Sequence, residues 1–103
     1  MAARPDLRDK KEGGYGSMTP LMRAALKGGP EVVELLADGG AQLDLLGSDG
    51  RTALWLAAFE NHPAVVRLLV GRGADQTIRG RDGRTPRELA VFHGHTECAM
   101  MLR

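Results

Sequence analysis

The chain has 103 residues, a length that accommodates one domain but not two. Apolar residues make up 43% and charged residues 26%, a balance typical of soluble globular proteins. The net charge of +1, from 14 basic and 13 acidic residues, argues against a dedicated nucleic-acid-binding domain, which carries a clear basic excess. One cysteine excludes an intramolecular disulfide framework, and an aromatic content of 4% argues against a base-stacking platform.

The start of the chain does not resemble a targeting signal. Residues 1–11 are charged and contain no apolar run, unlike a secretory signal. The longest apolar stretch, residues 53–59, is far too short to span a membrane. The lone Cys98 fits a reducing compartment. We therefore expect an intracellular protein, cytoplasmic or nuclear, without a membrane partner, and the sequence does not distinguish the two compartments.

A period of 33 residues runs through most of the chain, which indicates a repeat architecture. We place a flexible tail at residues 1–15, because this segment is polar and contains Gly13 and Gly14. Residues 16–103 form the repeat domain, with units at about 16–48, 49–81 and 82–103. The positions that recur at this period are Thr19, Thr52 and Thr85; Ala24, Ala57 and Ala90; and Leu36, Leu69 and Leu102.

The first helix of each unit is predicted to begin after its threonine. A threonine hydroxyl at this position accepts a backbone N–H that has no partner inside the helix. Pro20 and Pro86 follow directly, and proline has no N–H to lose in a first turn. The helices are predicted to end at Gly28, Asn61 and Gly94, since glycine and asparagine tolerate the left-handed conformation that closes a helix.

The second helix of each unit is predicted from a restart of the apolar pattern. The second helices are predicted to begin at Pro30 and Pro63. The sequence Val-Val-x-Leu-Leu follows each proline and places its apolar residues on one helical face. Connectors then lead to the turn pairs at residues 49–50 and 82–83. No unit can bury its apolar face alone, so the units must stack. The pattern therefore predicts an all-α solenoid of helix-turn-helix units.

Residues 50–75 resemble an ankyrin repeat almost position by position, and residues 18–41 resemble a second one. Residues 82–102 look like a closing repeat, either a modest cap or part of a longer array. The resemblance implies an ankyrin-repeat solenoid in which β-hairpin-like loops join the units. It also implies protein binding on a concave surface made by the connectors and the first helices.

The chain departs from the family pattern after each threonine. In the family, the residue three positions after the threonine is usually a histidine that bonds the threonine hydroxyl. Here that position holds Met22, Trp55 or Glu88. Glu88 offers a substitute, because Thr85 and Glu88 fit a capping box. For Trp55 we favour packing between neighbouring first helices over an exposed anchor, since tryptophan is highly buried on average.

Partner-contact positions follow from the resemblance, unit by unit. Phe59 and Phe92 occupy equivalent positions in neighbouring units. Two interpretations are possible: both rings anchor a partner beside arginine, or both pack between repeats as Leu26 does. Leu46 is a candidate contact, whereas Leu45 aligns with Ile78 and is expected to be structural. The other positions are Ser48, Asp49, Arg51 and Glu60 in the second unit, Arg81, Asp82, Arg84 and His93 in the third, and Tyr15 and Lys27 in the first.

Four arginines between Arg79 and Arg87, with Asp82 among them, form the densest charge cluster. It suits an acidic or phosphorylated partner, or it is simply a solvated loop. Nucleic acid is a minor alternative, given the near-neutral chain. His93, His95 and Cys98 carry metal-ligand chemistry, but a structural zinc site needs four ligands, and His95 aligns with His62 at a helix-opening position.

We therefore predict no metal, no cofactor and no catalysis, since the sequence has no catalytic motif. The expected function is that of a protein–protein interaction module, as an adaptor, scaffold or regulatory subunit. It would act as a monomer or within a larger complex. The alternative is a structural piece that links a longer array, which exposed apolar surface at Cys98, Met101 and Leu102 would favour.

Overall fold

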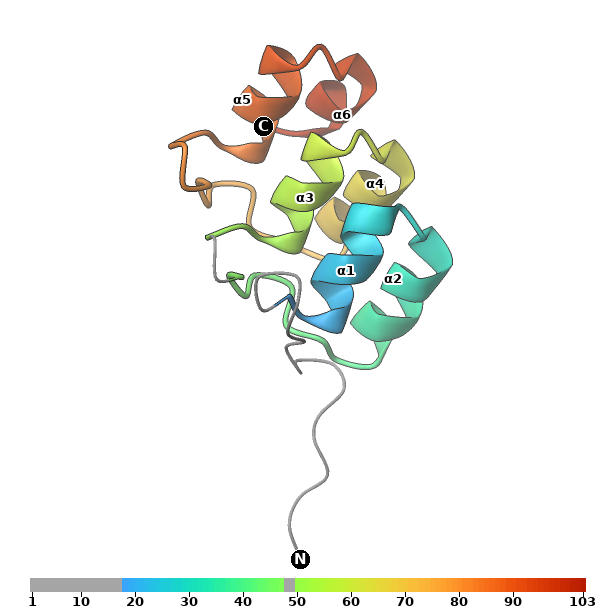
Figure 1. The fold of residues 1–103 in the computed structure, drawn as a ribbon. Helices are drawn as coiled ribbons and strands as arrows, with labels where there is room; N and C mark the ends of the chain where they lie inside the picture. Colours follow the sequence, from blue (N-terminus) through green and yellow to red (C-terminus); the bar gives the residue numbers. More distant parts are fainter. Residues whose placement is uncertain (1–17, 48–49) are drawn as a thin grey trace, which may run out of the picture.

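The structure, a computed structural model, describes residues 18–47 and 50–103. Six short helices form three antiparallel pairs that stack in chain order, and the described part contains no sheet (Figure 1). This is the all-α architecture that the repeat pattern predicts. The tail expected at residues 1–15 lies outside the described residues. The helices are α1 (Pro20–Lys27), α2 (Pro30–Asp38), α3 (Ala53–Phe59), α4 (Pro63–Gly71), α5 (Pro86–Phe92) and α6 (Thr96–Met101).

Each first helix begins as the threonine pattern predicts. The hydroxyls of Thr19, Thr52 and Thr85 accept the backbone N–H three residues ahead, at 3.1, 3.1 and 3.2 Å. The capping box of the third repeat is confirmed, because the Thr85 N–H donates to Glu88 Oε1 at 3.0 Å. In the first repeat the Thr19 N–H donates to the sulfur of Met22 at 3.4 Å, a weaker bond that the sequence analysis did not predict.

The same helices also end where glycine and asparagine predict. α1, α3 and α5 are followed within two residues by a residue in the left-handed region. These residues are Gly28 with φ 82°, Asn61 with φ 60° and Gly94 with φ 74°. Asn61 is the one non-glycine residue with positive φ in the described ranges, and asparagine tolerates this conformation better than other side chains do.

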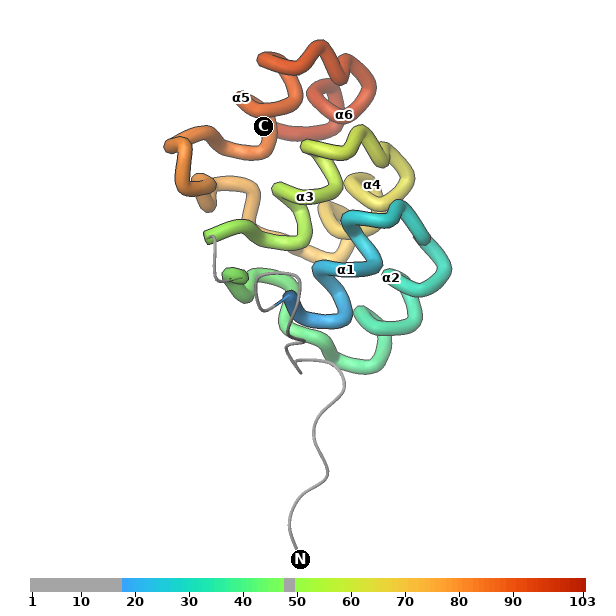
Figure 2. Tube along the Cα trace, in the orientation of Figure 1, coloured from blue at the N-terminus to red at the C-terminus, as the bar shows by residue number. Residues whose placement is uncertain are grey.

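Stacking produces two layers of helices. α1, α3 and α5 lie side by side in one layer, and α2, α4 and α6 form the other (Figure 2). α3 lies between α1 and α5, so all of residues 53–58 are buried. The core is therefore continuous from repeat to repeat, as expected for units that cannot bury an apolar face alone.

The two connectors between repeats project on the side of α1, α3 and α5 (Figure 1). Each is closed by a pair of backbone hydrogen bonds in the manner of a β-hairpin. This closure gives the stack a row of loops beside its first helices. The bonds run from Gly47 to Arg51 and from Gly50 to Gly47 in the first connector, at 3.0 and 2.9 Å, and from Gly80 to Arg84 and from Gly83 to Gly80 in the second, both at 2.9 Å.

The apolar surface of the third repeat does not lie at the residues that would have favoured a structural role in a longer array. Cys98 and Leu102 are buried and Met101 is half-buried, so these three residues do not form an exposed apolar surface. They occupy the positions that face the preceding repeat. Val91 and Met100 are exposed instead, because their face of α5 and α6 has no later repeat against it in the described chain.

No helix among the described residues is both long and apolar enough to cross a membrane.

Candidate protein-binding surface

One row of rings crosses from α3 to α5. The indole of Trp55 stacks on the ring of Phe59, with centroids 5.2 Å apart and planes 16° from parallel. The imidazole of His93 meets Phe59 edge-on at 5.4 Å and Phe92 edge-on at 5.1 Å. We call these four residues the aromatic row. It spans two repeats because residues 59 and 92 hold the same register, one repeat apart.

Arginine side chains lie over both ends of the aromatic row. The guanidinium of Arg51 lies 4.6 Å from the centroid of Trp55 and 5.8 Å from that of Phe59. The guanidinium of Arg84 lies 4.1 Å from the centroid of Phe92. Such cation–π contacts hold the planar guanidinium in place on the ring. The surface therefore presents apolar area and positive charge side by side.

The two phenylalanines, although equivalent in sequence, have different surroundings. Phe59 is half-buried between Trp55 and His93 and packs against the core. Phe92 is 63% exposed, and Arg84 covers one of its faces. The packing interpretation therefore fits Phe59, whereas Phe92 has the exposure that an interface anchor requires. The sequence could not separate them, because the difference comes from what stacks beyond each repeat.

Trp55 is only 4% exposed, which agrees with the packing interpretation and contradicts the exposed anchor. Its indole lies against the backbone of Gly80 in the second connector, where an added Cβ would come within 2.4 Å of Nε1. The indole N–H has no hydrogen-bond partner in the described part of the chain. The exposed edge of Trp55 lines a shallow pocket of about 280 Å³ together with Arg51, Arg81 and Asp82.

Acidic side chains pair with part of the arginine cluster. Asp82 accepts the backbone N–H of Arg84 and its Nη1, both at 3.1 Å, and the backbone bond is the main cause that lowers the pKa of this carboxyl. Glu88 accepts Arg79 Nη1 at 3.0 Å; its pKa is lowered first by the Thr85 N–H and then by the charge of Arg79. The cluster therefore carries less net positive charge than its arginines alone suggest.

The comparison with protein families agrees with this geometry. The sequence matches the family described as ankyrin repeats (3 copies) in two overlapping stretches, residues 2–80 and 21–103. The chain belongs to the ankyrin repeat family. No curated protein matches the sequence. Ankyrin repeat domains are generally protein-binding modules and are typically non-catalytic. The match includes most of the segment that we expect to be a tail, and the domain boundaries stay a prediction.

The remaining candidate contacts and their neighbours differ in exposure, and some lie outside the described residues. Leu46 is 48% exposed, whereas Leu45 is half-buried against the core, as its alignment with Ile78 suggested. Glu60 and Lys27 are exposed, and Leu26 packs against the ankyrin core. Ser48, Asp49 and Tyr15 lie outside the described residues.

The histidines at the helix-opening positions join neighbouring ankyrin repeats. His62 Nε2 bonds the carbonyl of Leu26, and His95 Nδ1 bonds the carbonyl of Ala58, both at 2.9 Å. Cys98 Sγ donates to Asn61 Oδ1 at 3.6 Å, and burial followed by the charge of Glu97 raises the pKa of its thiol. Within the described ranges, no three His, Cys, Asp or Glu side chains come together as metal ligands.

Proposed function

We propose that this ankyrin repeat domain binds an acidic segment of a partner protein across the aromatic row. The observation that carries the proposal is Arg84 lying over the exposed ring of Phe92. A few residues contribute most of the binding free energy in a protein interface, and aromatic and arginine side chains are enriched at such interfaces. In this role the domain would serve as an adaptor, scaffold or regulatory subunit, alone or within a larger complex.

Each part of the surface has a distinct task in this proposal. Phe92 supplies apolar area, and Arg84 and Arg51 supply positive charge in positions that their ring contacts already restrict. A side chain that is restricted before binding loses less entropy on binding. Trp55 and Phe59 support the surface from beneath, and only the edge of Trp55 reaches the pocket.

The connector residues act as the rim of the proposed interface. Arg81 is exposed and lines the same pocket as Arg51. A rim arginine mainly accelerates association with an acidic partner, and this effect weakens as salt screens the charges. Outside the aromatic row, which includes His93, the further positions that we assign to the proposed interface are Leu46, Ser48, Asp49, Glu60 and Asp82.

A pair of matched variants tests this proposal. One bait carries Phe92→Ala with Arg84→Glu, and the control bait carries Arg67→Glu on an exposed position of α4. Circular dichroism checks that both are folded before each is used to capture partners from nuclease-treated lysate. We expect a partner that the unaltered chain and the control retain and that the first variant loses. Equal retention by both variants would place binding elsewhere on the molecule.

A structural role in a longer array is the second candidate, favoured by the exposed Val91 and Met100. It predicts self-association of the chain without any partner that depends on Phe92. A phosphate-binding role for the cluster from Arg79 to Arg87 is less well supported, because the whole chain carries a net charge of only +1. It predicts binding to an RNA or DNA probe that falls steeply between about 50 and 200 mM salt.

A further inference from the structure

The guanidinium of Arg84 is held in one orientation by two neighbours. One of its faces lies on the ring of Phe92, 4.1 Å from the centroid. Asp82 Oδ2 accepts a hydrogen bond from Nη1 at 3.1 Å, and Asp82 Oδ1 accepts the backbone N–H of Arg84, also at 3.1 Å. The ring restricts the plane of the guanidinium, and the carboxylate restricts its rotation within that plane. The opposite edge, which carries Nε and Nη2, therefore has a defined direction.

This opposite edge has donors to offer. Within residues 18–47 and 50–103, no hydrogen bond or ion pair involves Nε or Nη2 of Arg84. The side chain is 39% exposed, which lets a group from outside approach it. Two N–H groups on one edge of a guanidinium match the two oxygens of a carboxylate or phosphate. Arg84 can therefore bind a second anion while it stays paired with Asp82.

The charge beside this edge favours a singly charged anion. Asp82 stays ionised at neutral pH, because hydrogen bonds from Arg84, first of all from its backbone N–H, lower the pKa of the carboxyl. Arg84 and Asp82 together thus carry no net charge. A phosphate group has close to two negative charges at pH 7, so Asp82 repels it more strongly than it repels a carboxylate. The edge therefore suits a carboxylate better than a phosphate.

The ring of Phe92 determines what accompanies this carboxylate. The ring is 63% exposed and lies directly against the guanidinium. A group that reaches the edge of Arg84 comes close to the ring as well, and an apolar side chain beside that group would cover it. Removing an aromatic ring from water favours binding. The surface therefore suits an acidic residue with a large apolar residue next to it.

We propose that Nε and Nη2 of Arg84 bind a side-chain carboxylate of the partner protein, and that the residue next to this carboxylate is a large apolar one that covers Phe92. The proposal rests on the proposed function and specifies which acidic segment the aromatic row recognises. Asp82 is a positioning residue in this arrangement, because it acts by orienting Arg84.

The role of Asp82 leads to an expectation that charge alone does not give. If Asp82 orients Arg84, its removal should weaken the binding of an acidic segment. If only the summed charge of the surface counts, the same removal should strengthen binding, because a surface with one acid fewer attracts an acidic segment more strongly. The sign of the change therefore separates orientation from simple attraction.

Three synthetic peptides added to the full chain test the proposal. Each surrounds one pair with glycine and serine, and the pair is phenylalanine followed by glutamate, glutamine or phosphoserine. NMR signals of the Arg84 Nε–H and the Phe92 ring report binding at the site. We expect the glutamate peptide to shift both signals, with a Kd on the order of 1 mM for so small an interface. The glutamine peptide should leave the Nε–H signal unchanged, and the phosphoserine peptide should bind more weakly than the glutamate peptide.

Substitutions at Arg84 and Asp82 separate geometry from charge. Arg84→Lys keeps the charge but lacks the paired N–H groups, and it should weaken the glutamate peptide about tenfold. Asp82→Ala should weaken it about threefold to fivefold. Asp82→Asn keeps an oxygen that can accept from Arg84 and should restore most of the affinity. Arg67→Gln, at an exposed position of α4, should leave the affinity unchanged. Amide spectra check that each variant is folded.

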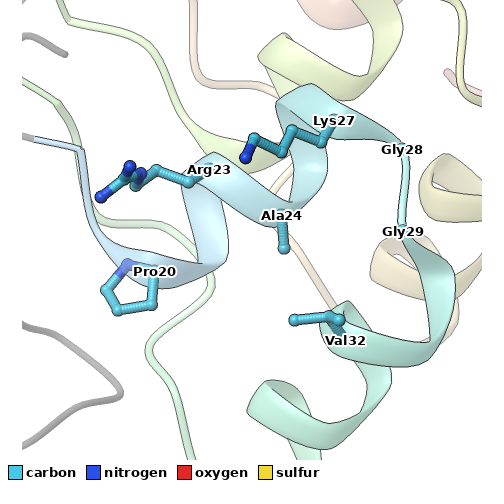
Figure 3. A pocket seen from close by; sticks show the side chains of 7 residues that line it. All are labelled: Pro20, Arg23, Ala24, Lys27, Gly28, Gly29 and Val32. Atoms are coloured by element: carbon cyan, nitrogen blue, oxygen red, sulfur yellow. The ribbon is translucent and has the colours of Figure 1, made fainter.

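A groove on the first repeat serves as the control region. It lies between α1 and α2 and has a volume of about 590 Å³. Ala24 and Val32 point into it (Figure 3). Because Arg84 and Phe92 belong to the third repeat, the glutamate peptide should leave the methyl signals of Ala24 and Val32 unchanged. Shifts of these methyl signals without shifts of Phe92 would move binding to this groove and contradict both proposals.

The other outcomes separate this inference from the proposed function. If the peptide shifts Phe92 but binds Arg84→Lys equally well, or binds Asp82→Ala more tightly, the oriented edge of Arg84 is wrong and the aromatic row remains a binding surface. Equal affinity for the glutamate and glutamine peptides, or tighter binding of the phosphoserine peptide, would overturn the choice of a carboxylate. No shift of Phe92 at about 10 mM glutamate peptide, roughly ten times the expected Kd, would overturn both proposals.

Discussion

The two joints between repeats use the same histidine position in different ways. At the first joint, between α1–α2 and α3–α4, His62 bonds the carbonyl of Leu26 through Nε2. At the second joint, between α3–α4 and α5–α6, His95 bonds the carbonyl of Ala58 through Nδ1. In the 33-residue register Leu26 corresponds to Phe59, so the second histidine bonds one residue earlier on the helix. The same motif residue thus joins the repeats through a different atom and a different carbonyl.

The residue that ends the preceding first helix, Gly28 at the first joint and Asn61 at the second, accounts for this difference. His62 lies directly on Gly28, where an added Cβ would come within 2.5 Å of the ring. At the second joint the equivalent residue is Asn61, and its side chain occupies space beside α6 and accepts the thiol of Cys98. Because a Cβ at the position of Gly28 would come within 2.5 Å of the His62 ring, a histidine placed in the same way at the second joint would meet the Cβ of Asn61. One side chain at the helix end therefore decides how the next repeat is held.

Charges and rings are also distributed differently between the joints. Arg72 on the second repeat pairs with Glu34 at 3.6 Å and with Asp38, so the first joint is tied by exposed ion pairs. The second joint has the edge contact of His93 with Phe59 instead. The first joint should accordingly respond to salt, and the second to changes in ring packing.

The largest difference in stability between the two joints should appear when a side chain is added at Gly28, beneath the imidazole of His62. Gly28→Ala adds strain at φ 82° and displaces the imidazole, and we expect it to cost about 2–4 kcal/mol of unfolding free energy. Asn61→Ala, which keeps a Cβ at the second joint, should cost only about 1 kcal/mol, since asparagine is the better left-handed residue. Urea denaturation measures both. Equal losses would show that the ring contact with Gly28 is unimportant.

The next largest loss of stability should come from the second connector, where Gly80 lies against Trp55. Gly80→Ala should cost about 1–3 kcal/mol, because the buried indole has no room to move away. Gly71→Ala is the matched control: nothing lies within 4 Å of its added Cβ, and we expect a change within about 1 kcal/mol in the stabilising direction. The fluorescence of Trp55, the single tryptophan, reports both unfolding curves. A neutral Gly80→Ala would contradict the close contact.

A smaller effect tests the ion pairs of the first joint. Arg72→Gln should lower the unfolding free energy by about 0.2–1 kcal/mol, the usual range for exposed pairs. The loss should fade as salt screens the wild-type charges. Arg67→Gln, at an exposed position of the same helix, should leave stability unchanged at every salt concentration. Thermal melts across a salt series make the comparison, and a loss that persists in high salt would indicate packing by the arginine stem.

The smallest effect is expected at acid pH and concerns Asp82 in the second connector and Glu88 in the first turn of α5. The pKa values of Asp82 and Glu88 are both lowered, so the unfolded chain binds protons first as the pH falls. Their contribution to stability is therefore present above the ordinary carboxyl pKa and is lost as the pH drops through the lowered values. Carboxyl NMR titration should find both below their ordinary range.

A substitution separates the causes of these pKa shifts. Arg79→Ala should leave most of the Glu88 shift in place, because the backbone N–H of Thr85 is its largest cause. A complete return of Glu88 to its ordinary pKa in this variant would instead assign the shift to the charge of Arg79.

The sequence predicts the local structure well because local rules determine it. Threonine, proline, glycine and asparagine define where the first helices begin and end, and Glu88 completes a cap with Thr85 as expected. Burial was harder to predict, because it depends on which neighbour covers each face. Phe59 and Phe92 look alike in the sequence and differ only because one lies inside the stack.

The second repeat contains both groups that form the hydrogen bond between neighbouring repeats: the carbonyl of Ala58, near the end of α3, and the donor His62. A tandem duplication of residues 50–82 would therefore place a histidine of the new copy next to a carbonyl of the old one, with no further substitution. The helix-end residue at that joint would be Asn61, so the inserted joint would resemble the second joint rather than the first. Growth of such an array by gene duplication would thus multiply one of the two joints and leave the other single.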